Sequence, residues 1–109
     1  MSDIDATILD RLYAVIESRK GADPSASWTA KLLAAGPEAI AKKVGEESTE
    51  TIVAALAQDR KALANESADL LYHLLVLWAA KGVAPEDVWR ALEAREGTSG
   101  IAEKASRKT

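Results

Sequence analysis

The segment from Leu70 to Ala80, LLYHLLVLWAA, is apolar almost all the way round a helix. A helix of that kind must be covered on most of its faces. The chain has 109 residues, which allows one domain with a single core but supplies too few helices to surround this segment. We therefore expect the segment to lie in a helical bundle that a second copy of the chain completes, most simply as a two-fold homodimer.

Composition favours helix along the rest of the chain. Alanine and leucine are abundant, phenylalanine is absent, and runs of β-branched residues hardly occur, so helix propensity is high nearly everywhere. We predict an all-α fold with a single domain over residues 1–96. Residues 97–109 are polar and interrupted by glycine, and composition alone predicts a mobile tail there.

Apolar residues recur at three- and four-residue steps and predict about five helices. Glycine, proline and serine mark the helix ends. The helices are expected over about residues 3–19, 27–36, 37–56, 61–81 and 84–95. On the second and fifth helices, the residues expected to face inward are Trp28, Leu32, Val88, Trp89 and Leu92.

Charge and cysteine content exclude several classes of protein. Fourteen basic and seventeen acidic residues give a net charge of -3, which offers no bulk attraction to nucleic acid or to an anionic membrane. The absence of cysteine excludes disulfides, thiolate zinc sites and cysteine nucleophiles. No signal peptide and no apolar stretch of about 18 residues is visible. We therefore expect a cytoplasmic protein without a nucleic-acid or membrane partner.

Five carboxylates at helical spacings form two clusters, Glu46, Glu47 and Glu50 in the first and Glu66 and Asp69 in the second. Like charges at these spacings cost a few tenths of a kcal/mol per pair, so a cationic partner is expected. Carboxylates at the margin of a core are also costly unless they are paired or metal-bound. Mg²⁺ prefers oxygen ligands, so the clusters predict a magnesium site. A solvated acidic helix face is the alternative interpretation.

Neighbouring residues are weaker candidates. Carboxylate-bridged iron in helical bundles uses a Glu-x-x-His step on two helices, whereas the single histidine, His73, follows Glu66 by seven residues. We therefore expect His73 to be a hydrogen-bonded residue at the edge of the core. Gly45 costs about 1 kcal/mol relative to alanine inside a helix and indicates close approach of a ligand or of another backbone. Lys31, Lys42 and Lys43 are candidates to contact phosphate.

The pattern EExxE, fifteen residues, then ExxD resembles the signature of the MazG-like superfamily of all-α nucleoside triphosphate pyrophosphatases. The surrounding segments SWTAKLL, IAKKVGEE, ESADLLYHLLVLW and GTSGIAEKASR resemble the phosphoribosyl-ATP pyrophosphatases of histidine biosynthesis. Trp28 departs from the pattern, since tyrosine is expected there more often. The resemblance implies a dimeric helical enzyme that uses Mg²⁺ to hydrolyse phosphoribosyl-ATP to phosphoribosyl-AMP and pyrophosphate.

The resemblance also implies roles for individual residues. All five acids become candidate metal ligands, and as a hypothesis Glu46 or Glu47 takes the proton of the attacking water. Lys31, Lys42 and Lys43 would hold phosphate oxygens. In contrast to the expectation from composition, Ser99, Lys104 and Arg107 in the tail would close over substrate.

Two alternatives stay open at this point. A housecleaning pyrophosphatase of the same fold would act on modified or excess (d)NTPs. A non-catalytic helical dimerisation module would carry an acidic surface and would hydrolyse no triphosphate in the presence of Mg²⁺.

Overall fold

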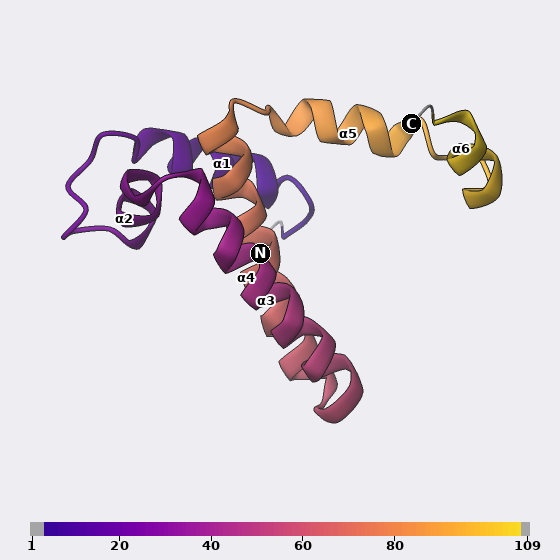
Figure 1. The fold of residues 1–109 in the computed structure, drawn as a ribbon, viewed down its shortest axis with the longest axis horizontal. Coiled ribbons are helices and arrows are strands. Elements are labelled where there is room, and N and C mark those ends of the chain that lie inside the picture. The colour runs from indigo at the N-terminus through magenta and orange to yellow at the C-terminus, as the bar shows by residue number, and fades with distance from the viewer. Residues whose placement is uncertain (1–3, 108–109) are drawn as a thin grey trace.

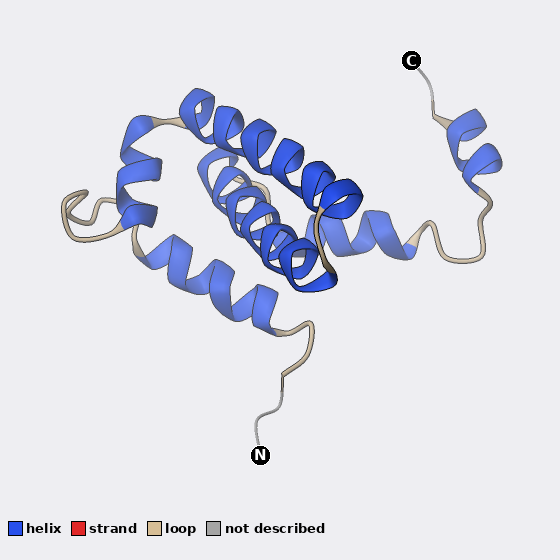
Figure 2. Ribbon diagram, turned by 90° about the horizontal axis from the view of Figure 1, so that it is seen from below, coloured by secondary structure: helices blue, strands red, loops and turns tan. Residues whose placement is uncertain are grey.

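The computed structural model describes residues 4–107, and within that range it contains six α-helices and no strand, which confirms the all-α prediction (Figures 1 and 2). Residue 3, where the first helix was expected to begin, lies outside the described residues. None of the described helices is both long enough and apolar enough to cross a membrane. The helices are α1 (Ile8–Ser18), α2 (Trp28–Ala35), α3 (Pro37–Ala57), α4 (Arg60–Lys81), α5 (Pro85–Glu93) and α6 (Gly100–Ser106).

The helix ends follow local sequence signals. Ser27 caps α2, because its hydroxyl oxygen accepts the backbone N–H of Ala30 at 3.2 Å. Asp59 caps α4 in the same way, accepting the N–H of Ala62 at 2.9 Å. Gly82 ends α4 with a φ of 72°, in the left-handed region that favours glycine. These caps fix where α2 begins and where α4 begins and ends.

The first helix is shorter than its apolar pattern predicts. The Asp5 carboxylate accepts the backbone N–H of Thr7 at 2.9 Å, so residues 5–7 form a turn and α1 begins only at Ile8. Ile4 is therefore left 83% exposed.

Helices α3 and α4 form an antiparallel hairpin whose two arms pack along their length (Figures 1 and 2). Helices α1 and α2 pack on this hairpin and cover the C-terminal half of α4 and the N-terminal half of α3. The core lies between these four helices. Its buried members are Ile16, Leu32, Ile40, Leu75, Val76 and Ala79.

Parts of the hairpin stay uncovered within one chain. Three apolar side chains near the end of α3 are exposed, namely Ile52, Val53 and Leu56, and Leu71 on α4 is 43% exposed. The apolar segment that starts at Leu70 is therefore only partly covered by its own chain. Helices α1 and α2 leave these four side chains exposed.

Two residues expected to face inward do not. Trp28 is 49% exposed because it is the first residue of the short helix α2, and Leu92 is 55% exposed because α5 leads away from the core (Figure 1). Trp89 holds the start of α5 against the core. Its indole N–H donates to the Asp10 carboxylate at 3.2 Å, and its ring meets the ring of Trp78 edge-on with centroids 6.0 Å apart.

Beyond α5, the polar tail contains regular structure. Residues 100–106 form α6, which Ser99 caps by accepting the N–H of Ala102 at 3.0 Å. In both views α6 lies away from the α3–α4 hairpin (Figures 1 and 2).

Candidate metal centre

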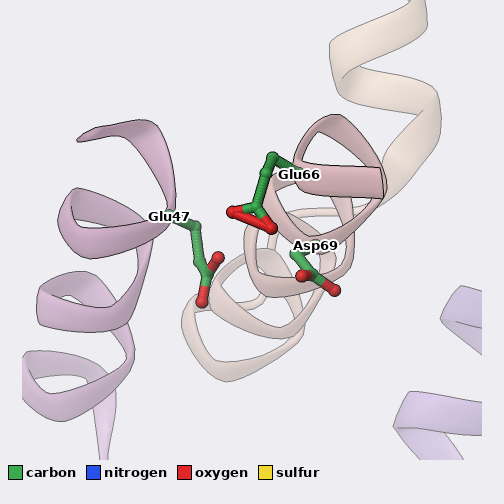
Figure 3. Close-up of side chains that lie close together, drawn as sticks. All are labelled: Glu47, Glu66 and Asp69. Carbon is green, nitrogen blue, oxygen red and sulfur yellow. The ribbon is translucent and has the colours of Figure 1, made fainter. Parts of the chain in front are cut away.

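Glu47 on α3 and Glu66 and Asp69 on α4 bring three carboxylates together (Figure 3). One oxygen from each of the three lies within 4.8 Å of the others. The hairpin explains this meeting, because Glu47 and Asp69 are each eleven residues from Gln58, which follows the end of α3. Residues equally far from the turn of an antiparallel hairpin lie opposite each other. The fifteen-residue spacer between the two acidic motifs thus sets them face to face.

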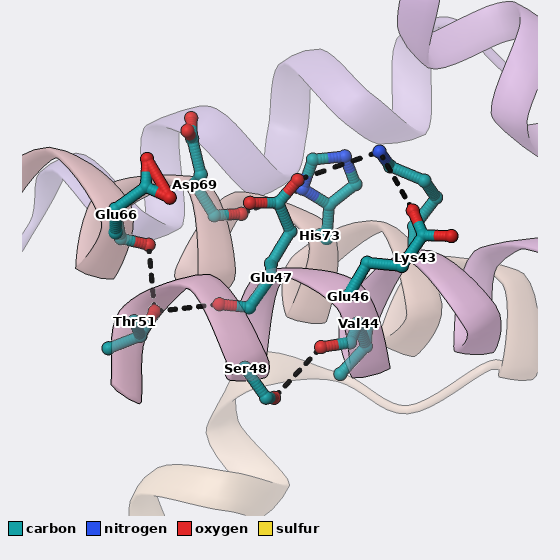
Figure 4. A network of polar contacts seen from close by, with 9 residues as sticks. All are labelled: Lys43, Val44, Glu46, Glu47, Ser48, Thr51, Glu66, Asp69 and His73. Carbon is teal, nitrogen blue, oxygen red and sulfur yellow. Dashed lines mark hydrogen bonds and ion pairs between the residues drawn. The ribbon is translucent and has the colours of Figure 1, made fainter. Parts of the chain in front are cut away.

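Thr51 ties the two helices together at this level. Its hydroxyl lies 2.8 Å from the Glu47 carbonyl oxygen, one turn back on α3, and 3.2 Å from the Glu66 carbonyl oxygen on α4 (Figure 4). A hydroxyl has a single hydrogen to donate, so the two carbonyls share it. Sequence reasoning missed Thr51; its position four residues after Glu47, on the same helix face, was the available signal.

The Glu47 carboxylate is buried and incompletely satisfied. The residue is only 7% exposed, and its Oε2 atom is buried without a hydrogen-bond partner. A buried carboxylate oxygen without a partner is costly. A metal ion held between Glu47, Glu66 and Asp69 would remove that cost, so the donor set and its burial fit a hard divalent cation.

Lys43 supplies the cation that the first acidic cluster was expected to need. Its ammonium lies 3.3 Å from a Glu46 oxygen and 3.6 Å from Glu47 Oε1 (Figure 4). The hydrogen bond to Glu46 is the main cause that raises the pKa of the Lys43 ammonium above its ordinary value, while desolvation acts in the opposite direction. Lys43 therefore stays charged beside the centre.

The remaining two acids lie outside the group of three. The Glu46 side chain is 48% exposed and faces Lys43. Glu50 is exposed and lines a shallow hollow of about 260 Å³ together with Thr49, Val53, Gln58 and Glu66. Since Glu66 belongs to both the hollow and the group of three, Glu50 borders the same region from the side of the turn.

His73 lies where the sequence predicts, at the edge of the core. Its Nδ1 atom is 2.7 Å from the Asp69 carbonyl oxygen, which can only accept, so Nδ1 carries the hydrogen and donates. The Nε2 atom is buried without a partner. The ring meets Tyr72 and Trp28 edge-on, with centroids 4.9 and 6.5 Å apart. His73 thereby braces the backbone that carries Asp69.

Other candidate residues lie further away. Lys31 and Lys42 are exposed on α2 and α3. Ser99, Lys104 and Arg107 cap, form or follow α6. That helix lies away from the α3–α4 hairpin on which the acids are carried (Figures 1 and 2).

For Gly45, the structure contradicts close approach of another backbone within the same chain, whereas close approach of a ligand stays a prediction. A Cβ atom built on Gly45 would meet nothing within 4 Å apart from its own helix. No close approach of another part of the described chain therefore explains this glycine.

Fold and site together define an all-α protein in which carboxylates from two antiparallel helices can hold a metal ion. Residues 9–96 match the family described as phosphoribosyl-ATP pyrophosphohydrolase. The chain belongs to that family, as its motifs predicted.

Individual relatives support the same assignment over nearly the full length. A protein of Caulobacter vibrioides is 63% identical over 107 residues, covering 98% of this chain and 99% of its own. One of Azospirillum brasilense is 59% identical over 106 residues, covering 97% and 96%. One of Gluconobacter oxydans is 56% identical over 100 residues, covering 92% and 75%. All three are named phosphoribosyl-ATP pyrophosphatase.

Proposed function

We propose that this chain hydrolyses phosphoribosyl-ATP to phosphoribosyl-AMP and pyrophosphate, the second step of histidine biosynthesis, in the cytoplasm. The observation that carries the proposal is the convergence of Glu47, Glu66 and Asp69 in a chain of the phosphoribosyl-ATP pyrophosphohydrolase family. The Oε2 atom of Glu47 is buried there without a hydrogen-bond partner. The catalytic domain would comprise residues 1–96 and the tail residues 97–109.

The metal we assign to the centre is Mg²⁺, held by Glu47, Glu66 and Asp69, with Glu46 and Glu50 at its margin. Bound there, it would neutralise charge on the triphosphate and activate water, as Mg²⁺ does in phosphoryl transfer. Water would attack the α-phosphorus in line and lose its proton to a carboxylate, while the bond from that phosphorus to the bridging oxygen of the leaving pyrophosphate breaks. Glu46 lies outside the group of three and keeps an oxygen for the proton of that water, so we prefer it to Glu47 as the base.

The lysines near the centre would hold the phosphates. Lys43 lies between Glu46 and Glu47 and can turn its ammonium toward a phosphate oxygen at the centre. Lys31 and Lys42 are exposed and can reach phosphate groups further out. Their charges offset the repulsion between the acids and a polyanionic substrate.

We infer that the working form is a homodimer. Ile52, Val53 and Leu56 on α3 and Leu71 on α4 expose apolar surface that a second copy would bury. Helix α6 lies away from the α3–α4 hairpin that carries the acids (Figure 2). We therefore assign Ser99, Lys104 and Arg107 to the nucleotide that is bound by the partner copy.

The direct test is release of pyrophosphate by the purified protein with Mg²⁺. Phosphoribosyl-ATP and a panel of dNTPs would be supplied separately. Turnover of phosphoribosyl-ATP alone supports the proposal, and turnover of dNTPs alone would assign a housecleaning role instead. Glu38→Gln, which changes an exposed carboxylate in the first turn of α3, is the control for charge removal and should keep full activity.

A further inference from the structure

Trp28 is exposed, yet the backbone on both sides of it is fixed. The Ser27 hydroxyl caps α2, and the Thr29 hydroxyl is hydrogen-bonded to the Tyr72 hydroxyl on α4. Half of the Trp28 surface nonetheless faces solvent. An indole held in this way presents an apolar face to solvent from a rigid support.

The Trp28 ring adjoins the metal centre. The Lys43 ammonium lies 5.9 Å from the centroid of the Trp28 ring, and the same nitrogen is 3.6 Å from Glu47 Oε1. On another side, the Trp28 ring meets His73, which donates to the Asp69 carbonyl oxygen. Trp28 is thus one side chain away from two of the three acids that converge.

We propose that the Trp28 indole is the surface on which the adenine base of the nucleotide stacks while the triphosphate lies at the acids. The proposal rests on the proposed function and names the group that reads the base. Flat aromatic side chains stack on nucleobases through the π-faces of both. In this arrangement Lys43 stands at the junction between the phosphates and the base, and Trp28 fixes the angle at which the nucleotide enters.

Calorimetric titrations in the presence of Mg²⁺ test the proposal with two probes, ATP and inorganic tripolyphosphate, which lacks a base. Trp28→Ala should weaken ATP binding by roughly 5- to 150-fold, the range for loss of one stacked base. Tripolyphosphate binding should change less than about twofold. Trp28→Tyr and Trp28→Phe keep an aromatic face and should restore ATP affinity to near the wild-type value.

Fluorescence supplies a second readout that is independent of turnover. ATP should quench tryptophan emission in the wild type and in Trp89→Phe, which removes the indole that donates to Asp10. It should leave the emission of Trp28→Phe nearly unchanged. In steady-state assays with phosphoribosyl-ATP, Trp28→Ala should raise KM more than it lowers kcat.

Several results would overturn the proposal. Equal loss of ATP and tripolyphosphate binding in Trp28→Ala would make Trp28 a structural residue. Equal affinity of the wild type for the two probes, once the difference in their net charge is corrected for, would show that the base adds nothing to binding and would also overturn the proposal. Dissociation of Trp28→Ala into monomers in sedimentation, with ATP binding intact, would mean that a second copy covers the indole. Failure of the wild type to hydrolyse phosphoribosyl-ATP would refute the proposed function alone, since the two-probe comparison needs no hydrolysis.

Discussion

The hydroxyl of Thr51 on α3 reaches across the hairpin to within 3.2 Å of the Glu66 carbonyl oxygen on α4. It joins the two helices at the level where their carboxylates converge. The alignment of Glu47 with Glu66 and Asp69 therefore depends on this contact between a side chain of α3 and the backbone of α4.

Thr51→Val, which keeps the shape but removes the hydroxyl, tests this contact. We expect a loss of about 0.5–1.5 kcal/mol in the free energy of unfolding, the usual net value of one hydrogen bond. The fall in kcat should be larger than this loss implies, up to about 100-fold, because small displacements of catalytic groups are costly. Urea unfolding and pyrophosphate release measure the two effects. Thr51→Ser should behave like the wild type, and normal kcat in Thr51→Val would refute an aligning role.

Glu47→Gln should have opposite effects with and without metal. In EDTA, removal of an incompletely satisfied buried charge should raise the free energy of unfolding by about 1 kcal/mol. With Mg²⁺ at 100 times its dissociation constant, the wild type should gain about 2.7 kcal/mol, and the variant should gain almost nothing. Turnover should fall by more than about 100-fold. Thermal unfolding with and without Mg²⁺ measures the gain in stability, and Glu38→Gln is the control. An equal gain in the wild type and in Glu47→Gln would exclude Glu47 as a ligand.

Mixed dimers can establish which copy receives the tail. Glu47→Gln and Arg107→Ala should each be impaired alone, since each protein lacks one part of every site. If the tail acts on the partner, each heterodimer contains one intact site, so equal random mixing restores about a quarter of the wild-type activity. No recovery after unfolding and joint refolding would instead place Arg107 at the acids of its own chain.

Because of the Tyr13 phenol, we expect the free energy of unfolding to depend on pH in the alkaline range. Its phenol donates to the Val83 carbonyl oxygen at 3.0 Å and ties α1 to the segment that follows α4. Burial, with a smaller contribution from Glu17, raises the pKa of Tyr13 above its ordinary value of 10.0. Because the folded-state pKa is the higher one, this contribution is present below about pH 10 and is lost as pH rises through the folded-state pKa.

Tyr13→Phe should therefore lower the free energy of unfolding by about 1 kcal/mol at pH 8. Between pH 9 and pH 11, the free energy of unfolding should fall less for the variant than for the wild type. Urea unfolding at each pH measures the difference. Parallel curves for the two proteins would show that the Tyr13 phenol does not titrate differently in the folded state.

The hairpin and its acids were predictable because the relevant signals are local. Helix periodicity gives two long helices, Gln58 and Asp59 break them, and the acids lie at matched distances from that break. The cap at Ser27 and the prolines at residues 37 and 85 are also local signals. Such features can be predicted without knowing which helices pack against each other.

Features that depend on distant packing were not predictable. Trp28 and Leu32 share a helix face at i and i+4, and the pattern alone predicts burial for both. Only the position of α2 relative to α4 shows that Leu32 enters the core while Trp28 faces solvent. The course of α5, which leaves Leu92 exposed, is likewise a tertiary property. Of the five acids, sequence spacing could not tell that Glu46 turns to Lys43 instead of joining the centre.

The converging acids lie partway along a helical pair, not at its looped end. A slide of α3 past α4 by one helical turn, about 5.4 Å, would separate the acids and break the contact between Thr51 and the Glu66 carbonyl oxygen. An ion bound by both helices would consequently oppose such a slide, so cation occupancy and hairpin rigidity should rise and fall together.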